Sequence, residues 1–205
     1  MNIESKYSAS FTAGALLYAE TIVLLKYLND DNISNITEQI KTNTLLKTNS
    51  ESSRKRIIAE IIKRYHSVNN KVFQLCSEVS IAEQKILLFY SCLKTYPLLF
   101  DFMFNIVIEK WLSLELVINS SDMKRFLDKQ SSAYSEIDTW TEKTHNKISS
   151  VTIKILKSAG ILENNKLVKV NLSHSFLKQF VIWGDSWFLQ ALLINKEQRD
   201  KIING

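Results

Sequence analysis

The clearest periodic pattern in the chain is an apolar stripe between residues 52 and 68. Its members recur at helical spacing: Ile57, Ile58, Ile61, Ile62, Tyr65 and Val68. Polar and charged side chains occupy the opposite positions: Ser52, Lys55, Arg56, Glu60, Lys63 and Arg64. β-Branched isoleucine is a mediocre helix former, so packing of the stripe must hold this helix in place. We therefore expect an amphipathic helix whose charges face outward.

Similar patterns predict helices along most of the chain. Apolar periodicity and capping residues predict them over residues 11–28, 34–41, 80–93, 97–108, 120–129, 136–158, 173–183 and 185–194. Segment 109–119 fits either a continued helix or a strand. Gly160 stands where a left-handed residue ends a helix, and residues 161–170 predict two short strands around Asn164-Asn165. The expected fold is mainly α with one short β-hairpin.

Composition also favours helices. The sequence has only four glycines and one proline, whereas all-β and nucleotide-cradling folds use these residues in their many tight turns. A soft boundary near residues 70–80 predicts two modules. Residues 1–75 form a helical, helix-turn-helix-like module that carries the basic helix, and residues 76–205 form a second helical module.

Residues 121–170 follow the order of a winged helix-turn-helix: short helix, turn, longer helix, hairpin. Such a helix is narrow enough to enter the DNA major groove, and the hairpin lays basic residues along the phosphates. The candidates on the helix are Lys143, His145, Asn146 and Lys147, and those on the hairpin are Asn164, Asn165, Lys166 and Lys169. The same winged-helix-like shape also serves protein contacts, which stays an open alternative.

Positive charge is concentrated in one segment. The whole chain has a net charge of +5, whereas residues 41–72 hold eight basic and two acidic residues. Such a patch attracts polyanions, and arginine forks grip phosphates or guanine edges. The candidate DNA contacts here are Ser52, Ser53, Arg54, Lys55, Arg56, Lys63 and Arg64. A solvated basic face is the alternative interpretation.

The sequence predicts no enzyme, metal site, cofactor or small-molecule substrate. The three histidines are far apart and lack ligand spacing, and no P-loop, GxGxxG or GxSxG motif occurs. Cys76 and Cys92 fit buried, reduced side chains of a cytosolic protein. The first residues lack the pattern of a secretory signal, and charges interrupt the most apolar stretch, 86–118. We therefore expect a cytoplasmic protein with no membrane span.

Several stretches of the sequence carry a resemblance to a known family: Tyr7–Leu16, Ser52–Ile57 with Glu60-Ile61 and Lys63-Arg64, Glu83–Lys85, Lys94–Leu98, Asp101–Met103 and Lys157–Leu162. These stretches resemble the BrxA-like family of BREX (bacteriophage exclusion) systems. The resemblance extends from about residue 7 to residue 170, and none of its stretches is catalytic.

The resemblance implies a small helical DNA-binding protein that is encoded beside a methyltransferase and a phosphatase-like component. Some members of the family look like the antitermination protein NusB, which binds RNA. The family supplies no agreed set of DNA-contacting residues, so the candidates above rest on charge and helical geometry. The resulting hypothesis is a non-catalytic component of a phage-defence system that binds double-stranded DNA mainly through its phosphates, with other BREX components as protein partners. An RNA-binding antitermination-like factor and a scaffold of the defence complex are the alternatives.

Overall fold

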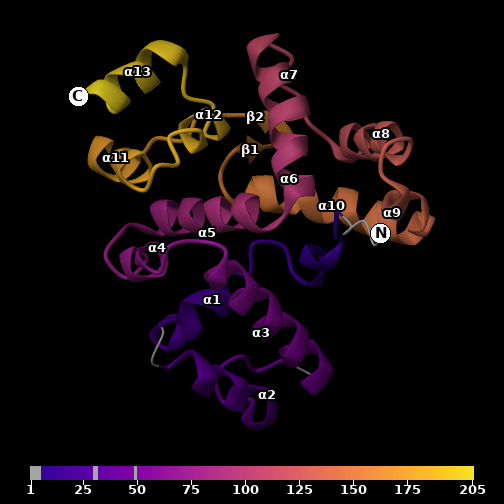
Figure 1. Cartoon of the computed structure of the whole chain (residues 1–205), viewed down its shortest axis with the longest axis vertical. Coiled ribbons are helices and arrows are strands. Elements are labelled where there is room, and N and C mark those ends of the chain that lie inside the picture. Colours follow the sequence, from indigo (N-terminus) through magenta and orange to yellow (C-terminus); the bar gives the residue numbers. More distant parts are fainter. Residues whose placement is uncertain (1–5, 30–31, 49) are drawn as a thin grey trace, which may run out of the picture.

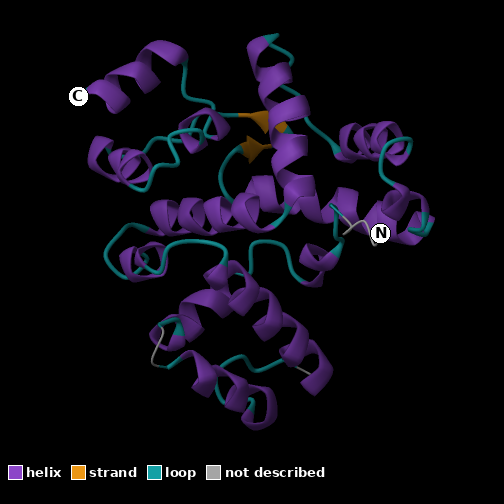
Figure 2. Cartoon of the chain, viewed as in Figure 1, coloured by secondary structure: helices purple, strands orange, loops and turns teal. Residues whose placement is uncertain are grey.

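The computed structural model describes residues 6–29, 32–48 and 50–205, and within these the fold is mainly α-helical, as predicted. Residues 1–5, which contribute to the expectation that no secretory signal is present, lie outside the described residues. Figures 1 and 2 show short elements in the first part of the chain, grouped around one long helix. In chain order these elements are η1 (Ser10–Ala13), α1 (Tyr18–Leu24), η2 (Leu25–Tyr27), η3 (Ile33–Thr37), α2 (Glu38–Thr42), α3 (Glu51–His66) and α4 (Lys71–Leu75).

The rest of the chain adds further helices and one hairpin. The helices before the hairpin are α5 (Ile81–Thr95), α6 (Pro97–Phe102), the π-helical turn η4 (Met103–Val107), α7 (Ile108–Leu112), α8 (Ser120–Ser131), α9 (Ser135–Asp138) and α10 (Glu142–Ser158). The hairpin and the elements after it are β1 (Leu162–Glu163), β2 (Lys166–Leu167), α11 (His174–Ile182), α12 (Phe188–Ala191) and α13 (Lys196–Asn204). In Figure 1 the column of α6 and α7 crosses α10.

The structure confirms that the amphipathic segment is a helix, α3. The Ser50 hydroxyl accepts the Ser53 N–H at 3.2 Å and so caps the first turn. Ile58, Ile61 and Tyr65 of the apolar stripe are buried, and α3 packs against η1, η3 and α5. Tertiary packing therefore holds the helix, as its isoleucine content requires.

The continuous helix expected over residues 11–28 was wrong. The backbone is extended at Gly14 and left-handed at Leu17 (φ 53°), which divides the segment into η1, α1 and η2. The carbonyl groups of residues 14, 15 and 16 accept hydrogen bonds from the Arg64 guanidinium. These carbonyls are therefore satisfied by a side chain of α3 instead of by a helix of their own.

The helix expected over residues 136–158 is divided into α9 and α10. The Thr141 hydroxyl accepts the Thr144 N–H at 3.2 Å, which makes Thr141 the N-cap of α10. Threonine stabilises a helix better as a cap than in the interior. Ile148, Val151 and Ile155 on the apolar face of α10 are buried, and α10 packs against α8.

The predicted hairpin is present. Asn164 and Asn165 have φ values of 48° and 62°, the left-handed pair that a two-residue hairpin turn requires. In the ambiguous segment 109–119, α7 continues to Leu112, and residues 116–118 then run antiparallel to β2. The Leu167 N–H donates to the Leu116 carbonyl at 2.7 Å, and the Ile118 N–H donates to the Asn165 carbonyl at 2.9 Å. The segment is thus part helix and part strand.

The C-terminal end differs most from the prediction. The helix expected over residues 173–183 is present as α11. The helix expected over residues 185–194 is reduced to the short α12. Its first part is a loop, in which the Asp185 carboxylate accepts hydrogen bonds from the Tyr90 hydroxyl and the Trp187 indole N–H. Helix α13 was not predicted. The Asn195 side chain starts it by accepting the Gln198 N–H at 2.9 Å.

One continuous apolar core joins the two parts of the chain, from Tyr7 to Ile202. The division into modules at residue 75 stays a prediction. Among the described residues no single helix is long and apolar enough to cross a membrane. The helical segments Ile81–Thr95 and Pro97–Leu112 are long and apolar enough only when taken together, and the chain bends by 106° between them.

Candidate nucleic-acid interface

Helix α3 presents a basic outer face. Ser52, Ser53, Lys55, Arg56 and Lys63 are all exposed. The Ser50 hydroxyl contacts both the Ser52 and Ser53 hydroxyls. The Lys63 ammonium donates to the Ser10 hydroxyl at 3.1 Å and lies 5.1 Å from the centre of the Tyr96 ring. Lys55 and Arg56 make no ion pair or side-chain hydrogen bond within the described residues, so their charges are available to a ligand.

Two of the predicted contacts on this helix do not face outward. Arg54 is 7% exposed, and its guanidinium donates to the carbonyls of Ile40 (2.6 Å) and Thr48 (3.2 Å). Arg64 is 2% exposed and donates to the carbonyls of residues 14, 15 and 16. Both arginines hold the N-terminal segments against α3. The expectation that all charges of this helix lie outward was therefore wrong for Arg54 and Arg64, and also for Glu60, which is 8% exposed.

Arg64 also belongs to a buried polar chain. Its Nε donates to the Tyr96 hydroxyl at 3.0 Å, and that hydroxyl donates to the carboxylate of Glu60. Burial raises the pKa of the Tyr96 hydroxyl, so it keeps its proton and remains a donor. These hydrogen bonds give the buried charges of Arg64 and Glu60 polar partners inside the protein.

Helix α10 presents a second basic face. Lys143 and Lys147 are exposed, and Lys154 and Lys157 follow them at helical spacing on the same face. Lys154 and Lys157 were not among the predicted contacts, although the spacing of seven positions from Lys147 to Lys154 and of three from Lys154 to Lys157 was a signal that could have identified them. The lysines from 143 to 157 extend along about 21 Å of the helix axis.

The structure brings the two basic faces together at one groove. Its volume is about 640 Å³, and it is lined by Thr12, Ala13, Arg56, Lys143, Thr144, Asn146, Lys147 and Ser150. The first two residues come from η1, which packs against both α3 and α10. No acidic side chain lines the groove. Within the described residues Arg56, Lys143 and Lys147 make no ion pair or side-chain hydrogen bond, so three uncompensated cations surround the groove.

The hairpin candidates lie elsewhere. Asn164, Asn165, Lys166 and Lys169 are exposed, but none of them lines the groove. The Lys169 ammonium donates to the Gln198 side chain at 2.8 Å, so α13 restrains it. His145, another candidate on α10, is half-buried and has its ring nitrogen 3.2 Å from the Ile137 carbonyl. The hairpin is therefore an exposed element outside the groove, and it follows α10 directly in the sequence.

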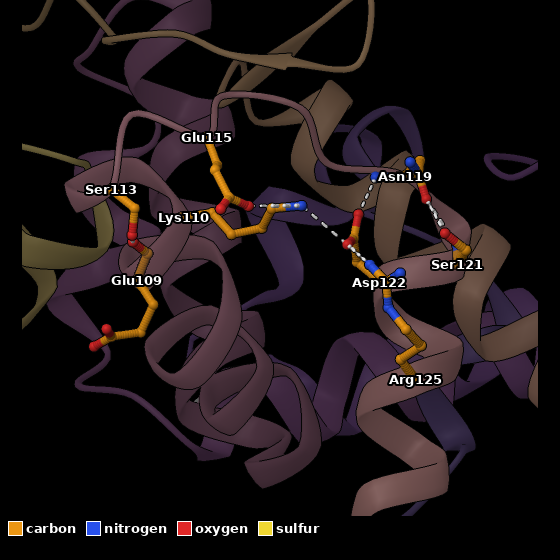
Figure 3. Close-up of polar contacts among 8 residues, drawn as sticks. All are labelled: Glu109, Lys110, Ser113, Glu115, Asn119, Ser121, Asp122 and Arg125. Carbon is orange, nitrogen blue, oxygen red and sulfur yellow. Dashed lines mark hydrogen bonds and ion pairs between the residues drawn. The ribbon is translucent and has the colours of Figure 1, made fainter.

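A polar cluster fixes the segment that pairs with the hairpin (Figure 3). The Asp122 carboxylate accepts hydrogen bonds from Lys110 (3.0 Å), Arg125 (2.6 Å) and the Asn119 N–H (2.8 Å). Burial alone would raise the pKa of Asp122, but these donors hold it below its ordinary value. The cluster ties the end of α7 to the start of α8 and thereby anchors residues 116–118 beside β2.

The family model described as BrxA matches residues 5–181. The chain belongs to the BrxA family. Its membership makes it a component of a BREX phage-defence system.

One relative and one solved structure show how far the similarity of this BrxA-family chain to known proteins extends. The BREX protein BrxA of Bacillus cereus (strain H3081.97) is 25% identical over 167 residues, which cover 80% of this chain and 82% of the relative. A crystal structure of an uncharacterized protein from Magnetospirillum magneticum superposes with a TM-score of 0.76 at 17% identity, over 93% of this chain and all of that one. At that identity the second likeness concerns the fold alone.

The described part of this BrxA-family chain contains no cluster of three or more His, Cys, Asp or Glu side chains that fits a metal ion. Both cysteines are buried. Burial raises the pKa of the Cys76 thiol to about 12, so the thiol stays protonated at neutral pH.

Proposed function

We propose that this chain is a non-catalytic, cytoplasmic component of its BREX system that binds double-stranded DNA, mainly through backbone phosphates. The observation that carries the proposal is the groove in which Arg56 of α3 meets Lys143 and Lys147 of α10. Other BREX components are the proposed protein partners.

Phosphates fit the charge pattern of this groove. Duplex DNA carries one negative charge per ~1.7 Å of helix axis, and neutralising it releases condensed counterions. A cation that already pairs with a carboxylate adds little binding free energy when it contacts a phosphate, whereas an unpaired cation adds the full electrostatic interaction. The three groove cations lack internal partners, and Lys154 and Lys157 continue the same face of α10. Lys55 adds a further exposed cation on α3, and no carboxylate lines the groove itself.

The order of elements supports a winged-helix mode of binding. Helix α8, the short helix α9, helix α10 and the hairpin follow one another, and residues 116–118 add a strand-like segment beside β2. In this mode α10 enters the major groove, while Lys166 and the asparagines of the turn lie along the phosphates. Asn146 and Ser150 on the exposed face of α10 are then the polar side chains closest to the base edges.

RNA binding is the rival function, and the two nucleic acids differ in shape. The major groove of A-form RNA is deep and narrow, so side chains of an inserted helix do not reach its bases. A fluorescence-anisotropy titration with random-sequence duplex DNA, competed by unlabelled duplex DNA or structured RNA at equal nucleotide concentration, tests the proposal. We expect duplex DNA to compete at least about tenfold better. Equal or better competition by RNA would favour the antitermination-like alternative, and no binding of the labelled duplex would refute the proposal.

A further inference from the structure

A second cavity, of about 280 Å³, lies between α11, α13 and the segment that leaves the hairpin. Its floor is apolar. Leu177, Ile194 and Ile202 line it and are otherwise almost fully buried, and Leu172 adds a half-buried side chain. The volume is close to the lower end of the range of small-molecule sites, ~300–1,000 Å³, and such sites are mostly apolar with a few converging polar groups.

The rim of this cavity is basic. Lys169, His174 and Lys201 line it, and no aspartate or glutamate does. The Lys169 ammonium donates to the neutral Gln198 side chain at 2.8 Å, so its charge is not compensated there. Lys201 pairs with Glu197 at 2.7 Å, but both side chains are more than 70% exposed. An exposed pair of this kind is weak and can yield to a better partner.

We propose that the cavity binds a small amphipathic anion, a molecule with one carboxylate or phosphate headgroup on a short apolar body. The apolar floor fits the hydrocarbon part, and the two lysines with the His174 ring attract and hydrogen-bond the headgroup. A nucleic-acid backbone does not match this site, because it has no apolar body to cover the floor. This ligand site was not expected from the sequence, and Lys169 is the residue of its lining that is also a candidate DNA contact of the hairpin.

Four of the ten residues that line the cavity lie beyond the segment that the family model matches. That match ends at residue 181, whereas Ile194, Lys201 and Ile202 come from the chain after it. Helix α13 supplies the outer wall and one of the two lysines. The site is therefore formed by residues after 181 together with the segment after the hairpin.

Calorimetric titration of the full-length protein with octanoate, octyl phosphate and 1-octanol tests this inference. The three probes share an apolar chain and differ in charge. We expect one site per chain, with at least one of the two anions binding about tenfold or more tighter than the alcohol. Octanol binding as tightly as the better anion, or no binding of either anion, would overturn the proposal.

A charge variant separates this site from general attraction to a basic protein. In Lys169→Ala/Lys201→Ala the affinity for the bound anion is expected to fall about tenfold, with the melting temperature retained because both side chains are exposed. Lys178→Ala/Lys196→Ala removes the same charge from α11 and α13 outside the cavity lining and is expected to bind like the parent protein. Equal losses in the two variants would contradict a specific site.

Discussion

Arg56 on α3 and Lys147 on α10 line the same groove, although their helices come from different parts of the chain. The short element η1 lies against both helices and contributes Thr12 and Ala13 to the lining. Two basic segments that the sequence presents separately thus form one surface. Arg64 holds the loop after η1 in place. It is therefore required for the shape of the groove, although it does not contribute to the charge of the groove.

Arg64→Ala is expected to lower the free energy of unfolding by about 3–5 kcal/mol. The substitution leaves the carbonyls of residues 14–16 without their donor and the Glu60–Tyr96 pair without its cation. Urea denaturation measures the change. Lys55→Ala on the exposed face of the same helix is the control and is expected to change stability by less than about 0.5 kcal/mol. A small effect of Arg64→Ala would show that the buried contacts contribute little.

Leu114→Gly is expected to stabilise the protein by about 0.5–1 kcal/mol. Leu114 is left-handed (φ 62°) at the C-terminal end of α7 and is 82% exposed, so a glycine relieves strain and loses almost no packing.

Leu193 provides the matched comparison, because it is also left-handed (φ 59°) but only 2% exposed. Leu193→Gly is expected to destabilise by at least about 2 kcal/mol, since the lost packing outweighs the relieved strain. Urea midpoints of the two variants should therefore shift in opposite directions. A shift in the same direction would contradict this account of the two turns.

Lys166→Ala/Lys169→Ala tests the role of the hairpin. If the hairpin lies along the phosphates, DNA affinity falls modestly, because each lysine supplies about one phosphate contact. Most of the loss is expected from Lys166, since Gln198 restrains Lys169. The turn at Asn164-Asn165 is unchanged, so the melting temperature is expected to stay the same. Normal DNA affinity with a loss of phage exclusion in cells would instead assign the hairpin to a protein partner.

Asp122→Asn is expected to destabilise the protein at neutral pH but progressively less in acid. The folded-state pKa of Asp122 lies below its ordinary value of 3.8. Its charged form therefore stabilises the fold above that pH, and this contribution is lost as the pH falls through the lowered pKa. Unfolding free energies of the parent and the variant are compared between neutral pH and about pH 3. Asp128→Asn, exposed on the same helix, is the control. A pH-independent difference would show that the Asp122 charge is not responsible.

Local patterns were sufficient to predict the elements that depend on local physics. The stripe from Ile57 to Tyr65 predicted α3, and the Asn164-Asn165 pair predicted the hairpin turn, because periodicity and turn chemistry act over a few residues. The burial of Arg54 and Arg64 could not be predicted in the same way. Their acceptors are backbone carbonyls of distant segments, which no residue type in the sequence reveals.

The candidate site was likewise predictable only in its parts. Charge density singled out residues 41–72, and element order singled out α10, but their meeting depends on how η1 packs between them. Lys154 and Lys157 were readable from helical spacing alone, because the helix predicted over residues 136–158 already contained them. Helix α13 lacked a clear apolar periodicity, because only Ile202 among its residues is buried.

The salt dependence of DNA binding tests the central claim most directly. For the parent protein, neutralising about four to six phosphates gives a slope of log affinity against log salt concentration of about −4 to −5. Arg56→Glu/Lys143→Glu/Lys147→Glu is expected to weaken binding at least about tenfold and to reduce the size of the slope by about three, with an unchanged melting temperature. Lys26→Glu/Lys71→Glu/Lys196→Glu makes the same charge change at exposed positions outside the groove and is expected to keep the parent slope. If the two triple variants keep the same affinity and slope, the groove between α3 and α10 is not where DNA binds.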